Sequence, residues 1–352
     1  MLTLSPSLDD RDVQEHLDLI VAPCRTAGLC AGTIRRLHQR FRVYAATCPV
    51  PLPARGLIIT REIRLQSEIY LPVAEIAAAF NRLYRETLVN PPILESTPFH
   101  NALSWADVFA ALPPQFQISP NPSRLLEGLL DRPEMLIEFL CASFLPQRFY
   151  GGFRRYPLQR EFVGSWLGRH NGKNLRCLDA ASGTGEDSFG LALLLLENGY
   201  QPEGFQIEGW TIEPLEVWSA AHARFPHDLV WEAAYRRETE AVFTRKAADR
   251  IRFRTVDLRE LAPASPLHES PDIFDLILCN GLLGGPIIHK PDDVGRVVVG
   301  LARLLAPGGI LLVADSFHGG WQRKHPQDWL RMYCESVGLA VCPAGEGICA
   351  CR

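Results

Sequence analysis

Five short apolar runs, separated by segments with helical periodicity, dominate the second half of this 352-residue chain. Runs this short and this apolar predict strands that are buried on both faces, and the helical segments between them predict crossover connections. We therefore expect an α/β fold, with a largely parallel sheet covered by helices on both faces. Ligands of such sheets bind beyond the carboxyl ends of the strands, so the residues after each run are the first candidates for a site. The runs are 175–178, 205–212, 251–256, 274–279 and 310–314.

The first half of the chain carries a different pattern. Apolar residues recur at helical spacing in 13–19, 33–44 and 73–87, whereas the alternation in 57–70 predicts a hairpin. Prolines and polar residues gather in 113–122, which predicts a linker. We expect a mixed or mainly helical N-terminal domain at 1–112, the linker at 113–122, a helical lead-in at 123–170 and a ligand-binding domain at 171–352.

Composition limits the classes of partner. The chain has 36 basic and 40 acidic residues, so it lacks the excess positive charge that drives bulk binding of nucleic acid. Five arginines without an acid lie in 25–42, a charge that suits an acidic protein, RNA or lipid surface, with a solvated helix face as the simpler interpretation. No apolar run reaches the ~18 residues of a membrane span, and the N-terminal residues turn acidic instead of forming a signal peptide. We expect a cytoplasmic protein that does not insert into membranes.

Ten cysteines are scattered among apolar residues, which is typical of buried, reduced thiols. Four of them fall near the end of the sequence: Cys334, Cys342, Cys349 and Cys351. Their spacing contains no CxxC pair and no histidine placed as in zinc modules. We therefore expect no metal site, while metal binding by these four residues stays an open question.

The turn after the first apolar run reads Asp-Ala-Ala-Ser-Gly-Thr-Gly-Glu-Asp and precedes an apolar helical segment at 188–197. Glycines in such a turn let the backbone approach a ligand and adopt dihedral angles that strain other residues. The alternative is a tight turn that binds nothing. If a ligand binds, we expect it to contact Asp179, Ala181, Ser182, Gly183, Thr184, Gly185 and Glu186.

Charge separates the ligands that this turn could hold. A dinucleotide places a pyrophosphate at the helix N-terminus and usually requires a third glycine, but that position is Ser188, and Glu186 and Asp187 would face the anion. The phosphate-loop pattern GxxxxGK[ST] is missing from the sequence. S-adenosylmethionine carries a sulfonium and an ammonium group, which acidic side chains attract. These acids therefore favour the methyl donor over NAD.

Polar residues follow the next three runs as well. Glu213 follows the second run, where a carboxylate can accept hydrogen bonds from both hydroxyls of a ribose. Asp257 and Leu258 follow the third run, at the position expected to receive an adenine amino group, and Asn280 follows the fourth, beneath the transferring methyl. Each of these residues alone could be an ordinary surface residue that follows a strand. Four such strand ends in this order are hard to obtain by chance.

This order of motifs, completed by Ala-Pro-Gly-Gly at 306–309 before the fifth run, resembles class I S-adenosylmethionine-dependent methyltransferases. Within that superfamily, residues 123–316 look most similar to the chemotaxis-receptor glutamate methyltransferases, whose S-T-G-E-E signature resembles the Ser-Gly-Thr-Gly-Glu loop. The resemblance implies a Rossmann-like sheet and S-adenosylmethionine as the cofactor. Residues 1–112 have no counterpart in it, and we expect them to select the acceptor or partner.

The chain departs from that family at two positions near the reacting methyl. Gly151 stands where an arginine usually follows the paired aromatic residues, and Gly284 stands where a tyrosine usually follows the fourth strand. These glycines lead us to expect that receptor glutamates are not the acceptor. An acceptor amine or hydroxyl needs a general base, for which Tyr150 and His289 are candidates, with Asn280 as a third catalytic candidate. The acceptor, a protein side chain or a small molecule, stays unassigned.

Three functions are compatible with these patterns. The leading hypothesis is an S-adenosylmethionine-dependent methyltransferase. The alternative is a chain that has lost catalysis and keeps the donor pocket as a sensor or scaffold, which the two glycines suggest. A nicotinamide-dependent oxidoreductase is the second alternative, and binding of S-adenosylhomocysteine would exclude it.

Overall fold

The computed structural model describes residues 1–22, 30–146, 152–170, 174–261, 273–285, 287–315 and 327–352. The chain forms two compact units. The first, called the sheet unit here, consists of Met1–Asp9, Tyr150–Arg224 and Ala233–Arg352. The second, the helical unit, consists of Asp10–Phe149 and Phe225–Glu232. Among the described residues, none of the helices is long and apolar enough to cross a membrane.

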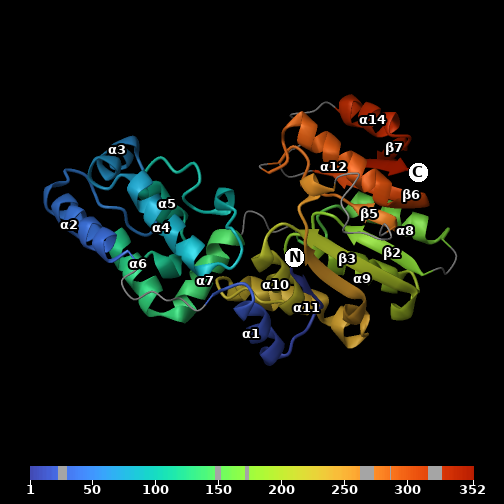
Figure 1. The fold of residues 1–352 in the computed structure, drawn as a ribbon, viewed down its shortest axis with the longest axis horizontal. Coiled ribbons are helices and arrows are strands. Elements are labelled where there is room, and N and C mark those ends of the chain that lie inside the picture. The colour runs from blue at the N-terminus through green and yellow to red at the C-terminus, as the bar shows by residue number, and fades with distance from the viewer. Residues whose placement is uncertain (23–29, 147–151, 171–173, 262–272, 286, 316–326) are drawn as a thin grey trace. The chain divides into compact units, whose positions relative to one another are not determined.

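The sheet unit is built on eight strands in the order β1-β4-β3-β2-β5-β6-β8-β7. Figure 1 labels β2, β3, β5, β6 and β7 of this sheet. The five predicted apolar runs form β2 to β6, and these strands are mutually parallel. β1 is antiparallel to β4 at one edge, and β8 and β7 add an antiparallel hairpin at the other. The strands are β1 (Thr3–Leu4), β2 (Leu175–Asp179), β3 (Phe205–Thr211), β4 (Ile251–Thr255), β5 (Phe274–Leu278), β6 (Leu305–Ala314), β7 (Ala340–Ala344) and β8 (Gly347–Cys351).

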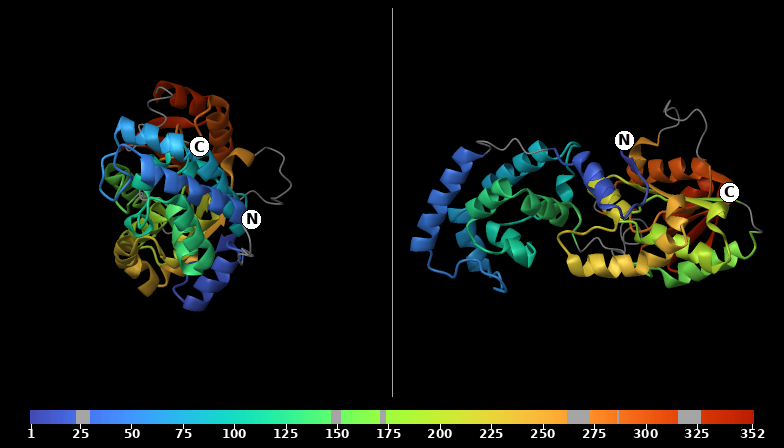
Figure 2. Two further views of the ribbon diagram at one scale, coloured as in Figure 1. Left: turned by 90° about the vertical axis from the view of Figure 1, so that its left-hand side faces the viewer. Right: turned by 90° about the horizontal axis from the view of Figure 1, so that it is seen from below.

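Helices cover both faces of this sheet, as the sequence predicts (Figures 1 and 2). On β2, Leu178 packs in the apolar cluster beneath α12 and α14, whereas its neighbour Asp179 bonds to Ser188 of α9. Successive strand residues point to opposite faces, so these helices lie on opposite sides. The helices are α8 (Pro157–Leu167), α9 (Glu186–Glu197), α10 (Pro214–His222), most of α11 (Leu229–Thr244), α12 (Pro291–Leu304), α14 (Gln327–Ser336) and the short 3-10 turns η4 (Pro202–Gly204), η5 (Ala247–Arg250) and η6 (Leu258–Glu260).

An amphipathic stripe holds α12 on the sheet. Val294, Val297, Val298 and Leu301 are buried at the i, i+3, i+4, i+7 spacing of one helix face and pack in the same cluster as Ile277 of β5. Burying each such side chain contributes about 1.5–3 kcal/mol. The stripe therefore fixes one face of the sheet beside the carboxyl end of β5.

The helical unit, drawn in blue to green in Figure 2, has an aromatic core. Phe139 contacts the rings of Phe80, Tyr84 and Phe116, with ring centroids 5.2–6.1 Å apart. The helices are α1 (Asp10–Asp18), α2 (Ala31–Thr47), α3 (Arg61–Tyr70), α4 (Val73–Thr87), α5 (Trp105–Ala111), α6 (Pro122–Asp131), α7 (Pro133–Phe144) and the 3-10 turns η1 (Leu94–Ser96) and η2 (Pro114–Phe116).

Two expectations for the first half of the chain were wrong. The alternating stretch at 57–70 is not a hairpin, because most of it forms α3, which begins where Thr60 accepts a hydrogen bond from the Ile63 N–H. The stretch at 113–122 does not divide two units, because it lies inside the compact unit formed by Asp10–Phe149. Phe116 is buried there, and the Trp105 Nε1 donates to the Pro120 carbonyl at 2.6 Å. The helical unit accordingly extends to Phe149, and the first nine residues join the sheet unit.

Candidate functional site

The carboxyl ends of β2, β3 and β5 meet at one edge of the sheet. Asp179 at the end of β2 pairs in register with Gly209 of β3 on one side and with Leu278 of β5 on the other. The chain leaves β2 toward β3 and reaches β5 only after β4, so the strand order reverses at β2. Crevices at such a reversal are where doubly wound sheets bind ligands.

A glycine turn follows Asp179 at this reversal. Gly183 has φ +49° and Gly185 has φ +93°, and the Gly185 N–H donates to the Ser182 carbonyl at 2.7 Å. The two glycines serve different purposes. A Cβ on Gly183 would meet no atom within 4 Å, whereas a Cβ on Gly185 would lie 2.9–3.0 Å from Phe253, Ala220 and Tyr235. Gly185 therefore permits close packing beneath the turn, and Gly183 leaves the backbone open above it.

Side chains hold the rest of the turn from inside. The Tyr235 hydroxyl donates to the Thr184 carbonyl at 2.7 Å, and the Thr184 hydroxyl donates to both carboxylate oxygens of Glu186 at 2.8 and 2.9 Å. Glu186 is the first residue of α9 and is buried. Burial raises its pKa to about 7, although the hydrogen bonds from its own N–H and from Thr184 oppose this.

Two polar atoms of the turn stay unsatisfied among the described residues. Oδ2 of the buried Asp179 accepts a hydrogen bond from Ser188 at 2.7 Å, but its Oδ1 is without a partner, as is the buried hydroxyl of Ser182. Burial and the nearby Asp187 carboxylate raise the pKa of Asp179. Buried polar atoms without partners are costly, so they indicate a place where a ligand can bind.

Asn280 belongs to a closed network instead. Its amide exchanges hydrogen bonds with Gln159 at 2.9 and 3.1 Å, and its Oδ1 also accepts from the Ala314 N–H at 3.1 Å. Its Nδ2 donates to Asp187 at 3.1 Å. Burial raises the pKa of Asp187, while Asn280 and the Arg155 guanidinium lower it. Asn280 thus holds Asp187 in place, a role that the sequence did not suggest.

A second pair of carboxylates lies after β3. Glu213 is buried, accepts from the Leu215 N–H at 3.2 Å and so caps α10. Burial raises its pKa to about 8, and the neighbouring Glu216 adds to this shift. Glu216 accepts a hydrogen bond from the Thr211 hydroxyl, and burial raises its pKa to about 7. Sequence reasoning missed Glu216, although it lies in the first turn of α10, where acidic residues are favoured.

These acids interact as one group, called the carboxylate cluster here. Asp187 and Glu186 each raise the pKa of Asp179, and Glu216 raises the pKa of both Glu186 and Glu213. Such mutual shifts require like charges at close range. The cluster consists of Asp179, Glu186, Asp187, Glu213 and Glu216, and Arg155 is the cation that counteracts it at Asp187.

The remaining predicted residues lie in different surroundings. Asp257 binds the Arg259 side chain through both carboxylate oxygens, and these bonds hold its pKa below the ordinary value although burial opposes them. Leu258 is buried in the apolar cluster that also holds Ala180. His289 is exposed just before α12, and Tyr150 lies outside the described residues.

A pocket adjoins the carboxylate cluster through Asp187 and Asn280. It lies between α8 and α9, and its cavity volume is about 50 Å³. The guanidinium of Arg155 reaches the turn after β5, because a Cβ on Gly281 would lie 3.3 Å from its Nη1. The polar lining comes from Arg154, Arg155, Gln159, Arg160, Asp187 and Asn280.

Fold and turn together define a doubly wound, Rossmann-like unit that resembles class I methyltransferases. The sequence is also similar to a curated methyltransferase. The probable biofilm formation methyltransferase WspC of Pseudomonas putida is 28% identical over 207 residues, which cover 54% of this chain and 45% of the relative. This chain spans less than half of the relative's length. No family model matches this chain.

Solved structures give weaker likenesses. The TehB-like S-adenosylmethionine-dependent methyltransferase of Corynebacterium glutamicum aligns with TM-score 0.33 and 16% identity, over 55% of this chain and 84% of the other. The 1,6-didemethyltoxoflavin N1-methyltransferase of Burkholderia thailandensis, solved with S-adenosylhomocysteine, aligns with TM-score 0.31 and 17% identity, over 55% of this chain and 76% of the other. At these scores the likenesses carry no argument about activity.

Proposed function

We propose that the chain is an S-adenosylmethionine-dependent methyltransferase that binds its donor at the glycine turn after β2. The observation that carries this proposal is the carboxylate cluster, whose buried members raise one another's pKa. A cationic ligand would relieve that repulsion, whereas a pyrophosphate would add to it. The same argument disfavours the nicotinamide-dependent alternative.

The residues of the turn suit this donor. The partnerless Asp179 Oδ1 and Ser182 hydroxyl can bind its polar groups, and the open backbone at Gly183 allows close approach. Glu213 is proposed to accept hydrogen bonds from the ribose hydroxyls. The proposed adenine contact at Asp257 and Leu258 rests on their place after β4. The Asp257 carboxylate itself is already bound to Arg259.

The bound donor would supply an electrophilic methyl group, and the protein's own task is to hold the acceptor atom in line with it. Such orientation contributes about 7–11 kcal/mol to a barrier reduction. We propose that the pocket beside Asp187 and Asn280 admits the acceptor. An acceptor carboxylate needs no base, and Arg155 could bind it; an amine or hydroxyl would need one.

The nature of the acceptor is proposed from charge. Arg155 supplies a cation that Gly151 and Gly284 do not, so receptor glutamates return to the set of acceptors to be assayed. In the helical unit, two adjoining pockets between α2 and α6 are lined by Arg35, Arg42 and Arg124, of which Arg124 pairs with Glu127 at 3.2 Å. Their charge would suit an acidic protein surface. We propose that this unit selects the acceptor.

Two measurements test the proposed function. Isothermal titration calorimetry should show one-site binding of S-adenosylmethionine and S-adenosylhomocysteine, and failure to bind either would refute the proposal. Labelled methyl transfer should then be followed in cell extract, with volatile methanol released in base as the sign of a methyl ester. Donor binding without any transfer would favour the sensor or scaffold alternative.

A further inference from the structure

The β7–β8 hairpin gathers three cysteines from the end of the chain. Cys342 of β7 lies directly opposite Cys349 of β8 in the strand register. Cys351 follows Cys349 by two residues on the same strand, so its side chain points to the same face. The intervening Ala350 packs in the apolar cluster on the other face. All three thiols therefore share one side of the hairpin.

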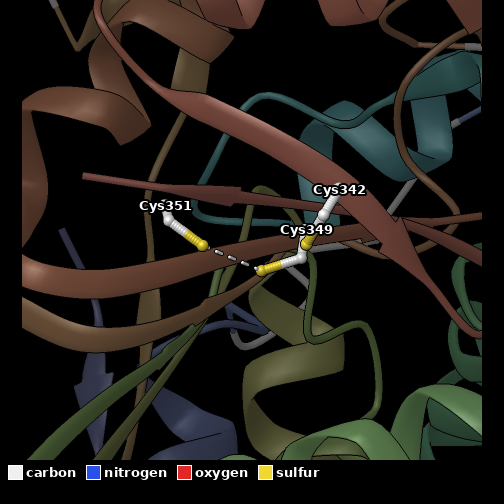
Figure 3. Close-up of side chains that lie close together, drawn as sticks. All are labelled: Cys342, Cys349 and Cys351. Atoms are coloured by element: carbon white, nitrogen blue, oxygen red, sulfur yellow. Dashed lines mark hydrogen bonds between the residues drawn. The ribbon is translucent and has the colours of Figure 1, made fainter.

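The three sulfur atoms are close enough to bind one ion. They lie within 4.8 Å of one another, and the Sγ atoms of Cys349 and Cys351 are 3.6 Å apart (Figure 3). With a zinc–sulfur bond of about 2.3 Å, two sulfurs on one tetrahedral ion are separated by about 3.8 Å. Small side-chain adjustments would bring the three sulfurs into that geometry.

We propose that Cys342, Cys349 and Cys351 bind one thiophilic metal ion of the Zn²⁺ or Cu⁺ class. The candidate ligand atoms of this cluster are all cysteine sulfurs. Sets of thiolates select Zn²⁺ or Cu⁺ over Mg²⁺ or Ca²⁺. Cys349 is buried, whereas Cys342 and Cys351 are partly exposed. An ion can therefore enter from the surface, and its fourth position stays open to water or a small thiol.

Protonation does not prevent binding. When a thiol binds a metal ion, the ion displaces the proton of the thiol. An ion bound to cysteines of both β7 and β8 would stabilise this hairpin at the edge of the sheet.

The test uses the full chain, reduced and freed of metal. Zn²⁺ is titrated against a chromophoric chelator, Cu⁺ is titrated under anaerobic conditions against a copper-specific chelator, and Co²⁺ serves as a spectroscopic probe of thiolate ligands. We expect one equivalent of Zn²⁺ or Cu⁺ per chain and a sulfur-to-cobalt charge-transfer band. Cys342→Ser and Cys351→Ser should each weaken binding about 100-fold or more, since loss of an outer-shell partner alone costs 10- to 100-fold.

Cys48→Ser is the matched control, because Cys48 is also partly exposed but lies in the helical unit. It should bind metal as the unaltered chain does, and thermal unfolding checks that all variants are folded. The two half-exposed positions are chosen over the buried Cys349 so that the fold survives the change. Absence of stoichiometric binding, or equal affinity in Cys342→Ser, Cys351→Ser and Cys48→Ser, would overturn the proposal.

Discussion

Glu213 has two roles that a substitution must separate. Its carboxylate caps α10 through the Leu215 N–H, and it is also the proposed partner of the donor's ribose. Glutamine keeps an oxygen that can cap the helix but removes the charge. Alanine removes both and should cost about 1 kcal/mol of stability as a lost N-cap.

We predict that Glu213→Gln weakens S-adenosylmethionine binding about 10- to 100-fold, because hydrogen bonds to a charged group contribute about 1.5–3 kcal/mol. Titration calorimetry measures the affinity, and thermal unfolding should show a stable fold. Glu240→Gln, an exposed change on α11, is the control. Equal affinities for the two variants would remove Glu213 from the donor site.

The two glycines of the turn should respond differently to alanine. At Gly185 the new methyl group would lie 2.9–3.0 Å from three side chains at φ +93°, so we predict a loss of stability of about 1–3 kcal/mol from overpacking. At Gly183 the methyl group meets open space, and the backbone strain of about 1–2 kcal/mol should leave the protein folded. Gly183→Ala should instead lose donor affinity. If it binds the donor normally, the turn has a structural role alone.

At the scale of elements, the carboxylate cluster joins the ends of β2 and β3 to the starts of α9 and α10. Burial raises the pKa of Glu213 to about 8 and of Glu216 and Glu186 to about 7. The ordinary value for glutamate is 4.5. Between these values the folded state binds more protons than the unfolded state, so its stability falls as pH rises.

We therefore predict that the ligand-free protein is less stable at pH 8.5 than at pH 6, and that the thermal stabilisation by S-adenosylmethionine grows over the same range. The second effect follows because a cation favours the ionised carboxylates, so binding releases protons. Thermal unfolding with and without the donor measures both. In Glu216→Gln, the loss of stability between pH 6 and pH 8.5 should be smaller. An unchanged loss in that variant would contradict the assignment of the pH dependence to the carboxylate cluster.

The helix α3 shows why local patterns mislead. Its alternation suggested a strand, yet Leu65 and Ile69 are about 60% exposed, so they were not core positions. The helix is set by the cap at Thr60 and by tertiary contacts, including the Ser67 hydroxyl that accepts from the Ala106 N–H at 3.1 Å. A polar residue that anchors a helix is invisible to hydrophobic periodicity.

At the scale of the whole molecule, the division into units decides which truncated chain is informative. β1 pairs with β4, so residues 1–9 belong with the sheet. A chain that begins near residue 119 would lose this strand, and it would leave α6 without α2 and Phe139 of α7 without the rings of α4. The informative variant therefore joins 1–9 to 152–352 through a Gly/Ser linker.

We predict that this variant binds S-adenosylhomocysteine with unchanged affinity but loses methyl transfer to the natural acceptor, because the helical unit is proposed to select it. Calorimetry and labelled transfer in cell extract measure the two properties. A second variant that begins at residue 152 lacks β1 and should unfold at a lower temperature. Undiminished transfer by the linked variant would refute the division of labour.

The sequence by itself determined the parallel core of the sheet, the glycine turn and the acids at the strand ends. Short apolar runs, positive-φ glycines and helix caps are properties of neighbouring residues, so they can be recognised without knowing the fold. Asp179, Gly183 and Glu186 meet at one edge for this reason, and Glu213 follows from the same rule for parallel strands.

Only the tertiary structure decided which distant residues meet. Gln159 and Asn280 form one amide pair from α8 and the end of β5, and β1 joins a strand some 250 residues away in sequence. Cys342 opposes Cys349 because a hairpin register, not a CxxC spacing, sets their distance. Contacts of this kind depend on how whole elements pack and pair, which no local pattern encodes.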